Sequence, residues 1–152
     1  MLPIIYQDDD LVAINKPSGL LVHRSAIDKR ETQFAVQELR NQLGGQHVYP
    51  LHRLDKPTSG VLVFALSAKA ASYYGQQWQE NKVKKQYVAL SRGFAPEHMT
   101  IDYALRQEAD LTAGIQAGKE AQQATTHIAL LAKYSLPKAL DRYNETRFSL
   151  LQ

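Results

Sequence analysis

Hydrophobic and polar positions cluster in short segments along the chain, and these segments predict the elements of the fold. Residues 4–7 and 11–15 are short β-rich runs on either side of an acidic stretch at 8–10, a pattern typical of a hairpin. Residues 16–19, Lys-Pro-Ser-Gly, end the second strand, because proline offers no ladder donor and glycine tolerates positive φ. Residues 20–23 are predicted to form a further short extended run.

Two segments have the periodicity of amphipathic helices. The first runs from Asp28 to Leu43, with Asp28 and Glu31 resembling a capping pair and Gly44 and Gly45 ending the helix. Its apolar stripe consists of Phe34, Ala35, Leu39 and Leu43. The second helix follows Ser67, a good N-cap residue, and its inner face carries Ala71, Tyr74 and Trp78. Aromatic residues at helical spacing predict core packing rather than a ligand site.

Two later segments are predicted to be strands, and a third is predicted to be a loop. Residues 61–66 are apolar without alternation, which favours a strand buried on both faces. Residues 83–90 alternate imperfectly and are also predicted to form a strand. Residues 111–123 are poor in large apolar side chains, so we expect a mobile loop there.

The last part of the chain predicts a second hairpin. Residues 125–134 and 143–151 have a β-like composition on either side of Pro137. The chain stops within the second of these strands, and natural domains seldom end in mid-strand, so we expect a chain that is truncated at its C-terminus, either as a fragment or because the gene itself is shortened. No internal repeat or domain linker is visible. Residues 1–152 are therefore predicted to form one α+β unit, with a mixed, mostly antiparallel sheet and flanking helices.

Length and composition are those of an ordinary globular protein. The 152 residues are 44% hydrophobic and 22% charged, which excludes disordered, collagen-like and disulfide-rich chains. No apolar run approaches the ~20 residues of a membrane helix, and the N-terminus lacks the features of a signal peptide. Cysteine is absent, which removes thiol catalysis, iron–sulfur clusters and thiolate zinc sites. We therefore expect a cytoplasmic protein without a membrane segment.

Positive charge is concentrated around a single carboxylate. The formal net charge is only +3, but Asp55 is the one acidic residue between positions 39 and 79. The basic residues of this region and of the next stretch without acids are Arg40, Arg53, Lys56, Lys69, Lys82, Lys84, Lys85 and Arg92. A basic surface around one carboxylate suits a phosphate-rich partner. The alternative is a solvated surface whose acidic residues lie elsewhere in the chain.

Residues 51–60, Leu-His-Arg-Leu-Asp-Lys-Pro-Thr-Ser-Gly, are the strongest candidate site, because a polar loop here leads directly into an apolar strand. Asp55 beside Arg53 and Lys56 is expected to stay ionised and could act as a nucleophile or a base. The alternative is that Asp55 caps a turn and pairs with Arg53. A metal site is not expected, since the spacing of His23, His47 and His52 does not resemble that of zinc ligands.

Residues 52–61 resemble the catalytic signature of the RluA-type family of pseudouridine synthases. Residues 15–23 are similar to the upstream motif of that family, and residues 85–93 are similar to its strand bearing an active-site tyrosine. The surroundings of residues 22–25, 102–103 and 126–127 most resemble members that modify tRNA. The match covers nearly the whole chain, whereas the Gly-Arg-x-His-Gln-Leu-Arg-type segment of the family has no counterpart.

The resemblance implies a cofactor-free isomerase that detaches uracil from C1′ of a uridine, rotates it and rejoins it through C5. It implies that Asp55 is the catalytic carboxylate, as nucleophile or base. Arg53 would fill the stack vacated by a flipped uridine, and Tyr87 would pack on the uracil near C5. The implied partner is RNA, with tRNA first and ribosomal RNA second. The implied fold over residues 1–152 is the N-terminal part of a single pseudouridine synthase catalytic domain.

Two other interpretations stay open. One is a non-catalytic RNA-binding remnant or a truncated fragment, which keeps the basic surface but lacks turnover. The unmatched segment favours this remnant, whereas the joint presence of Asp55, Arg53 and Tyr87 favours the enzyme. The other is an unrelated carboxylate hydrolase. It is disfavoured because glycosidase-type chemistry needs a second acid near the first, and the nearest acids in the sequence are Glu38 and Glu80.

Overall fold

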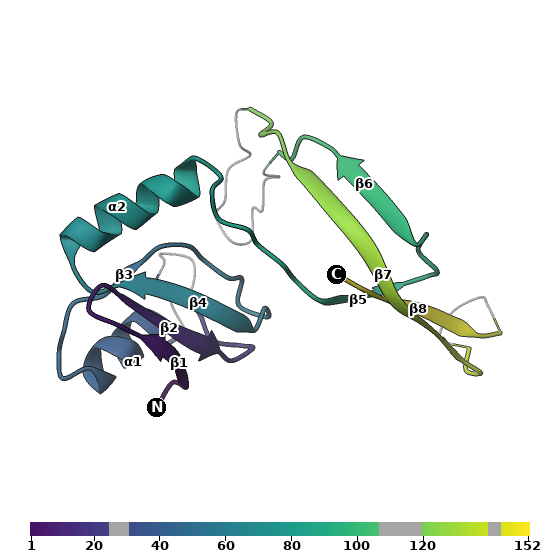
Figure 1. Ribbon diagram of the computed structural model, residues 1–152. Helices are drawn as coiled ribbons and strands as arrows, with labels where there is room; N and C mark the ends of the chain where they lie inside the picture. Colours follow the sequence, from purple (N-terminus) through teal and green to yellow (C-terminus); the bar gives the residue numbers. More distant parts are fainter. Residues whose placement is uncertain (25–30, 107–119, 140–143) are drawn as a thin grey trace. The chain divides into compact units, whose positions relative to one another are not determined.

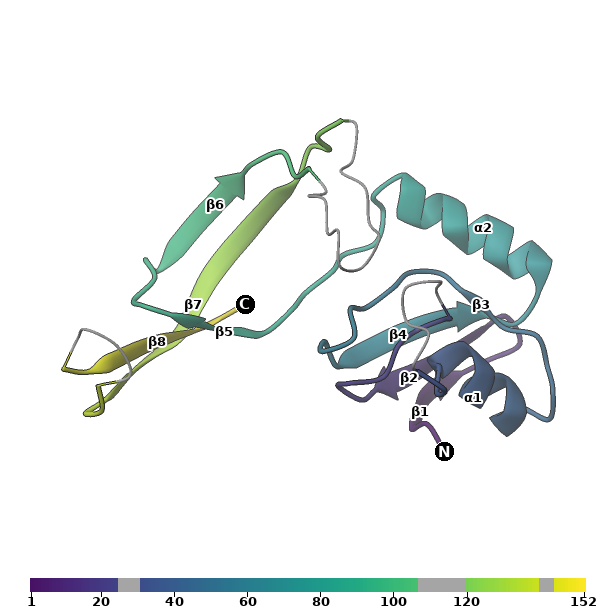
Figure 2. The same ribbon diagram turned by 180° about the vertical axis from the view of Figure 1, so that it is seen from behind.

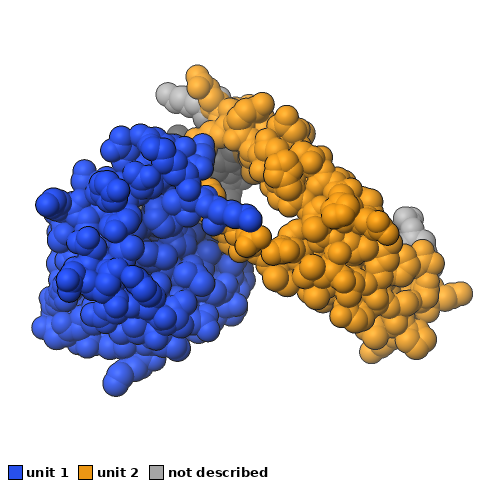
Figure 3. Space-filling model, viewed as in Figure 1, with its two compact units in different colours: residues 1–84 blue, residues 85–152 orange. Residues whose placement is uncertain are grey.

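The computed structural model describes residues 1–24, 31–106, 120–139 and 144–152. Contacts between Cα atoms divide the chain into two compact units, residues 1–84 and residues 85–152 (Figure 3). That both units are part of one catalytic domain stays a prediction. No helix in the described ranges is both long and apolar enough to cross a bilayer.

Unit 1, residues 1–84, consists of a four-stranded antiparallel sheet and two helices (Figure 1). The strands are β1 (Ile4–Gln7), β2 (Leu11–Lys16), β3 (Tyr49–Pro50) and β4 (Gly60–Ala65), in the order β1-β2-β4-β3, and the helices are α1 (Ala35–Gln42) and α2 (Ala68–Gln79). The predicted hairpin is confirmed. Its turn is closed by the Asp8 carboxylate, which accepts hydrogen bonds from the amides of Asp10 (2.9 Å) and Leu11 (2.7 Å).

The core of unit 1 lies between the sheet and α1. It is formed chiefly by Val12, Ile14, Leu62 and Phe64 of β2 and β4, together with Ala35 and Leu39 of α1. The register pairs Val12 with Phe64 and Ile14 with Leu62, so these side chains share one face of the sheet. On the opposite face Val61 is 56% exposed. The prediction that this strand is buried on both faces is therefore wrong, because only the α1 side of β4 is fully covered.

Helix α1 begins later than predicted. Its N-cap residue is Phe34, and Asp28 of the expected capping pair lies outside the described residues. The first two amides of the helix donate to the carbonyls of Leu21 (2.8 Å) and Val22 (3.0 Å). These carbonyls satisfy first-turn donors that a side-chain cap would otherwise bind. Within the extended run predicted at residues 20–23, Leu21 forms an isolated bridge with Phe34, and none of the strands in the described part of the chain includes these residues.

The other predicted helix ends are confirmed. The amide of Gly45 donates to the carbonyl of Arg40 (2.8 Å), and Gly44 and Gly45 have φ values of 70° and 93°. This is the left-handed C-terminal arrangement that favours glycine. At the start of α2 the Ser67 hydroxyl accepts a hydrogen bond from the Ala70 amide (3.1 Å).

Unit 2, residues 85–152, is a second four-stranded antiparallel sheet (Figure 2). Its strands are β5 (Ala89–Arg92), β6 (His98–Asp102), β7 (Thr125–Leu136) and β8 (Thr146–Leu151), in the order β5-β8-β7-β6. The first part of β7 pairs with β6 and the later part with β8, which confirms the predicted second hairpin. No helix is present among the described residues of this unit, and its buried residues there are Thr146 and Ser149.

The strand predicted at residues 83–90 is largely wrong, because β5 begins only at Ala89. Strand β8 pairs with residues 89–92, and no ladder is recorded for residues 83–88 among the described parts of the chain. Alternation alone does not make a strand when no neighbouring strand supplies hydrogen bonds. The loop predicted at residues 111–123 falls mostly within 107–119, outside the described residues. The predicted α+β class with mostly antiparallel pairing is confirmed.

Candidate active site

The segment singled out by the sequence, residues 51–60, connects β3 to β4 and is anchored to unit 1 at several points. The side chain of Leu54 is only 9% exposed and belongs to the core. Nε2 of His52 accepts a hydrogen bond from the Val63 amide (3.2 Å), and the His52 ring stacks on Trp78 of α2 with centroids 5.4 Å apart. Buried and stacked neighbours restrict this loop, so its polar side chains are carried on a rigid support.

Asp55 lies at the start of a tight turn in this loop. The Thr58 amide donates to the Asp55 carbonyl (3.0 Å), while the side chains of Asp55 and Arg53 are both exposed. Among the described residues neither side chain makes a hydrogen bond or an ion pair. The ion pair with Arg53, considered above as the structural alternative, is therefore not formed. Both side chains are accessible to a substrate.

A second loop, residues 16–20, is hydrogen-bonded to the Asp55 turn although it lies about forty positions away in the sequence. The Gly19 amide donates to the Lys56 carbonyl (2.7 Å), and the Ser18 hydroxyl donates to the Pro57 carbonyl (2.7 Å). Gly19 has a φ of 86°, a left-handed conformation that glycine adopts without strain. The upstream motif noticed in the sequence thus supports the turn that carries Asp55 through hydrogen bonds.

Lys16 is fully buried between these two loops. Its ammonium donates to the carbonyls of Leu20 (2.7 Å), Pro17 (3.0 Å) and Lys56 (3.3 Å). Burial lowers the pKa of Lys16, and the negative charge of Asp55 opposes that shift. The fixed positive charge near Asp55 is therefore Lys16. The Lys56 ammonium forms an ion pair with Glu31.

Lys16 is the residue that sequence reasoning missed as part of the site. The signal was present, because strand alternation places Lys16 on the same face as Val12 and Ile14, which are both fully buried. A lysine at a core-facing position must find acceptors for its ammonium, and loop carbonyls are suitable acceptors. This arrangement leaves the carboxylate of Asp55 exposed and in electrostatic interaction with a buried cation, and such a carboxylate can act as a nucleophile or as a base.

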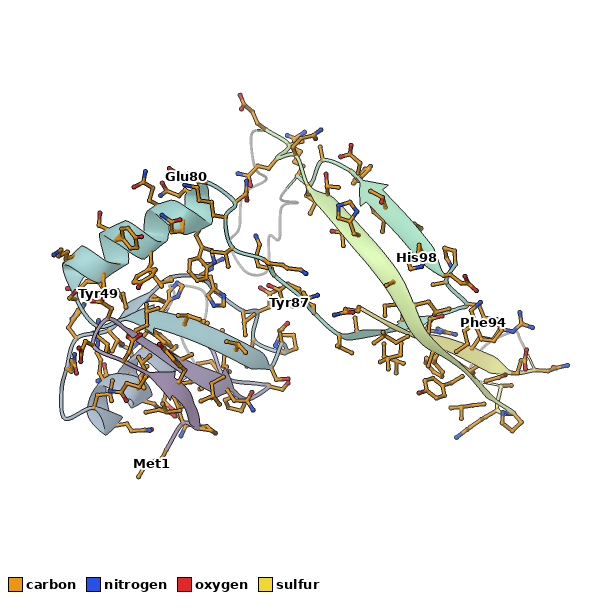
Figure 4. All side chains as sticks on the ribbon, in the orientation of Figure 1. Met1, Tyr49, Glu80, Tyr87, Phe94 and His98 are labelled. Carbon is orange, nitrogen blue, oxygen red and sulfur yellow. The ribbon has the colours of Figure 1, made fainter. Side chains whose placement is uncertain are left out.

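The third predicted site residue belongs to the other unit. Tyr87 lies on the segment that leads into β5, and its side chain is 53% exposed (Figure 4). Asp55 and Arg53 share one loop of unit 1, so the structure brings those two together directly. The participation of Tyr87 in the same site stays a prediction.

The histidines that could be imagined as metal ligands have other neighbours. His47 lies 4.5 Å from Tyr49 between ring centroids, and its Nε2 is 3.0 Å from Nη2 of Arg40. His52 is occupied by Val63 and Trp78, as described above. Within residues 1–24, 31–106, 120–139 and 144–152, no group of three or more histidine or acidic side chains is arranged to hold a metal ion.

Several curated proteins are similar to this chain over its whole length. It is 51% identical to a tRNA pseudouridine synthase C of Vibrio parahaemolyticus over 99% of the chain and 62% of that relative. It is 50% identical to a tRNA pseudouridine synthase C of Haemophilus ducreyi, again over 99% of the chain and 62% of the relative. The chain thus spans about three fifths of the length of these relatives, and the predicted similarity to the RluA-type synthases is confirmed.

Solved structures and a family model give the same result. The structure of human RNA Pseudouridylate Synthase Domain Containing 1 superposes with a TM-score of 0.71 and 26% identity, covering 99% of this chain and 58% of the human one. That of human RNA Pseudouridylate Synthase Domain Containing 4 gives a TM-score of 0.64 at 26% identity, with the same coverage. Since residues 10–152 match the family model for RNA pseudouridylate synthase, the chain belongs to the RNA pseudouridylate synthase family.

Proposed function

We propose that this chain acts in the isomerisation of a specific uridine in tRNA to pseudouridine, and that both units are parts of one catalytic domain. The observation that carries the proposal is the exposed Asp55 carboxylate, held on a tight turn that also accepts a hydrogen bond from the buried ammonium of Lys16 through the Lys56 carbonyl. The family match runs through both units, which supports a single catalytic domain. The names of the similar curated proteins support tRNA as the RNA.

Asp55 has the central role in the proposed reaction. The C1′–N1 bond of the uridine breaks, the uracil rotates, a C1′–C5 bond forms, and the proton on C5 leaves. Asp55 either attacks C1′ as the C1′–N1 bond breaks and leaves C1′ again as the C1′–C5 bond forms, or it removes the 2′ proton and returns it as the C1′–C5 bond forms. Each route needs an ionised carboxylate beneath the ribose. The loop carbonyls that bind Lys16 keep its positive charge in place near this carboxylate.

Arg53 and Tyr87 have binding roles in the proposal. The target uridine leaves the RNA stack to reach Asp55, and the planar guanidinium of Arg53 takes its place. The exposed side chain of Arg53, two positions before Asp55, suits this role. The exposed ring of Tyr87 packs on the flipped uracil, because every base presents a flat face for stacking.

The test is the substitution Asp55→Asn in the full-length protein that contains these 152 residues. Tritium release from tRNA labelled with [5-³H]uridine is expected to stop, because an amide keeps the shape of the side chain but is neither nucleophile nor base. Affinity for tRNA is expected to stay within a few-fold. The matched control is Asp9→Asn, the same change at an exposed carboxylate in the β1–β2 turn, which should release tritium at the wild-type rate. Tritium release by Asp55→Asn, or none by the wild type, would refute the proposal.

A further inference from the structure

An exposed aromatic ring with two basic neighbours lies in unit 2. Phe94 follows β5 and is 46% exposed (Figure 4). The guanidinium carbon of Arg147 lies 5.1 Å from the centroid of its ring, and the ammonium of Lys133 lies 5.7 Å from it. We refer to Phe94, Lys133 and Arg147 as the Phe94 cluster. Both cations are within the ~6 Å at which a cation interacts with a ring face.

The fold holds the Phe94 cluster rigidly. Ser149 of β8 is fully buried, and its hydroxyl donates to the Gly93 carbonyl (2.9 Å) while accepting from the Ala95 amide (2.9 Å). These two bonds fix the backbone on either side of Phe94. The register pairs Lys133 with Ser149, and Arg147 lies two positions before Ser149 on β8, so both basic side chains share the face of the sheet to which the Ser149 hydroxyl belongs.

The space and the charge beside the ring suit an anionic partner with a flat group. Phe94 and Arg147 line a hollow of about 830 Å³, and Arg92 contributes a further positive charge to its lining. Glu145 is the acidic residue among the described lining residues, and it accepts a hydrogen bond from Nε of Arg147 (2.6 Å). Lys133 adds a second cation beside the ring and makes no ion pair among the described residues, so it carries positive charge that Glu145 does not neutralise.

We propose that the Phe94 cluster is a second RNA-binding surface, in which an unpaired base stacks on Phe94 and the adjacent phosphate contacts Lys133 and Arg147. The inference rests on the proposed function insofar as RNA is the partner. An exposed ring accepts any base by stacking, and the neighbouring cations bind the phosphate of the same nucleotide. An acidic peptide would use the cations but would leave the exposed ring without a flat partner, so nucleic acid fits the cluster better.

The test measures the dissociation constant of fluorescein-labelled tRNA for the 152-residue chain by fluorescence anisotropy. Phe94→Ala should raise Kd about tenfold, and Phe94→Trp should keep wild-type affinity because it retains a stacking surface. The matched control is Tyr73→Ala on α2, which removes another exposed aromatic ring and should leave Kd unchanged. Circular dichroism of each variant establishes that the sheets are intact.

A charge substitution tests the cluster without changing the ring. Lys133→Ala should raise Kd about threefold and reduce the slope of log Kd against log salt concentration by about 1, as expected for one lost phosphate contact. Lys133→Arg should restore both values. Wild-type tRNA affinity in Phe94→Ala and Lys133→Ala would overturn the proposal. The proposal would also be overturned if these variants lost affinity for a poly-glutamate peptide but not for tRNA, because that result would identify an acidic protein as the partner.

The two proposals fail in different experiments. Unchanged tRNA affinity in the Phe94 and Lys133 variants removes the second surface and leaves the role of Asp55 standing. Tritium release by Asp55→Asn removes the proposed chemistry, while the binding measurements with tRNA still decide whether the Phe94 cluster contacts RNA.

Discussion

The role of Lys16 can be tested by the substitution Lys16→Met, which keeps the length and apolar character of the side chain but removes the ammonium. In the native protein the ammonium donates to three loop carbonyls, of which the bond to Leu20 is buried and those to Pro17 and Lys56 are partly buried. Methionine cannot donate hydrogen bonds. The substitution therefore leaves these acceptors without a donor and removes the cation near Asp55.

The magnitude follows from the burial of these bonds. A buried acceptor left without a partner costs about 1–3 kcal/mol, and a partly solvated one costs less because water replaces the donor. Removing the ammonium also removes the unfavourable burial of a charge, which offsets part of this loss. We expect the free energy of unfolding of unit 1 to fall by about 2 kcal/mol, which corresponds to a decrease of about 1–2 M in the urea midpoint.

The assay is urea unfolding followed by the fluorescence of Trp78, the single tryptophan of the chain, which lies in unit 1 and stacks on His52. The matched control is Lys69→Met in α2, where an exposed lysine is replaced and the free energy of unfolding should change by less than about 0.5 kcal/mol. An unchanged midpoint in Lys16→Met would show that the buried ammonium does not hold the two loops together.

The pH dependence gives an independent check on the same residue. Because burial lowers the pKa of Lys16 in the folded state, the unfolded chain binds more protons between that lowered pKa and the ordinary value of 10.5. The stability of the wild type relative to Lys16→Met should therefore increase as pH rises through this window. A difference that is constant up to pH 10.5, or that shrinks, would contradict the assigned shift.

Two further predictions concern Arg53 in unit 1 and Ser149 in unit 2. Arg53→Ala should weaken binding of a duplexed target RNA far more than that of a loop-presented uridine, because the side chain offsets a flipping cost of about a few kcal/mol; gel-shift affinities compare the two, and equal losses would indicate a phosphate contact instead. Ser149→Ala should destabilise unit 2 by about 1–3 kcal/mol. It should also speed hydrogen exchange of the Ala95 amide, because that amide donates to the Ser149 hydroxyl. The Gly93 amide donates to the Arg147 carbonyl instead and serves as the internal reference. Wild-type exchange at Ala95 would contradict this role of Ser149.

The sequence alone predicted the features that depend on neighbouring residues. The Asp8 turn, the glycines after α1 and the Ser67 cap of α2 are each closed by groups within a few positions of one another. Local hydrogen bonds and backbone preferences are encoded in short stretches of chain, so these elements could be recognised. The contiguous motif around Asp55 could be recognised for the same reason, since its residues lie side by side in the sequence.

Only the tertiary structure decided the features that depend on distant partners. The start of α1 is set by carbonyls of Leu21 and Val22, and the strand expected at residues 83–90 begins only at Ala89, where β8 offers a ladder. Lys16 and the Asp55 turn lie about forty positions apart in the sequence. They are in contact because β2 and β4 pair antiparallel, which places the loop after β2 and the loop before β4 at the same end of the sheet. Burial and strand pairing depend on which distant segments meet in space, and the periodicity of a short segment does not indicate which other segment it will pack against.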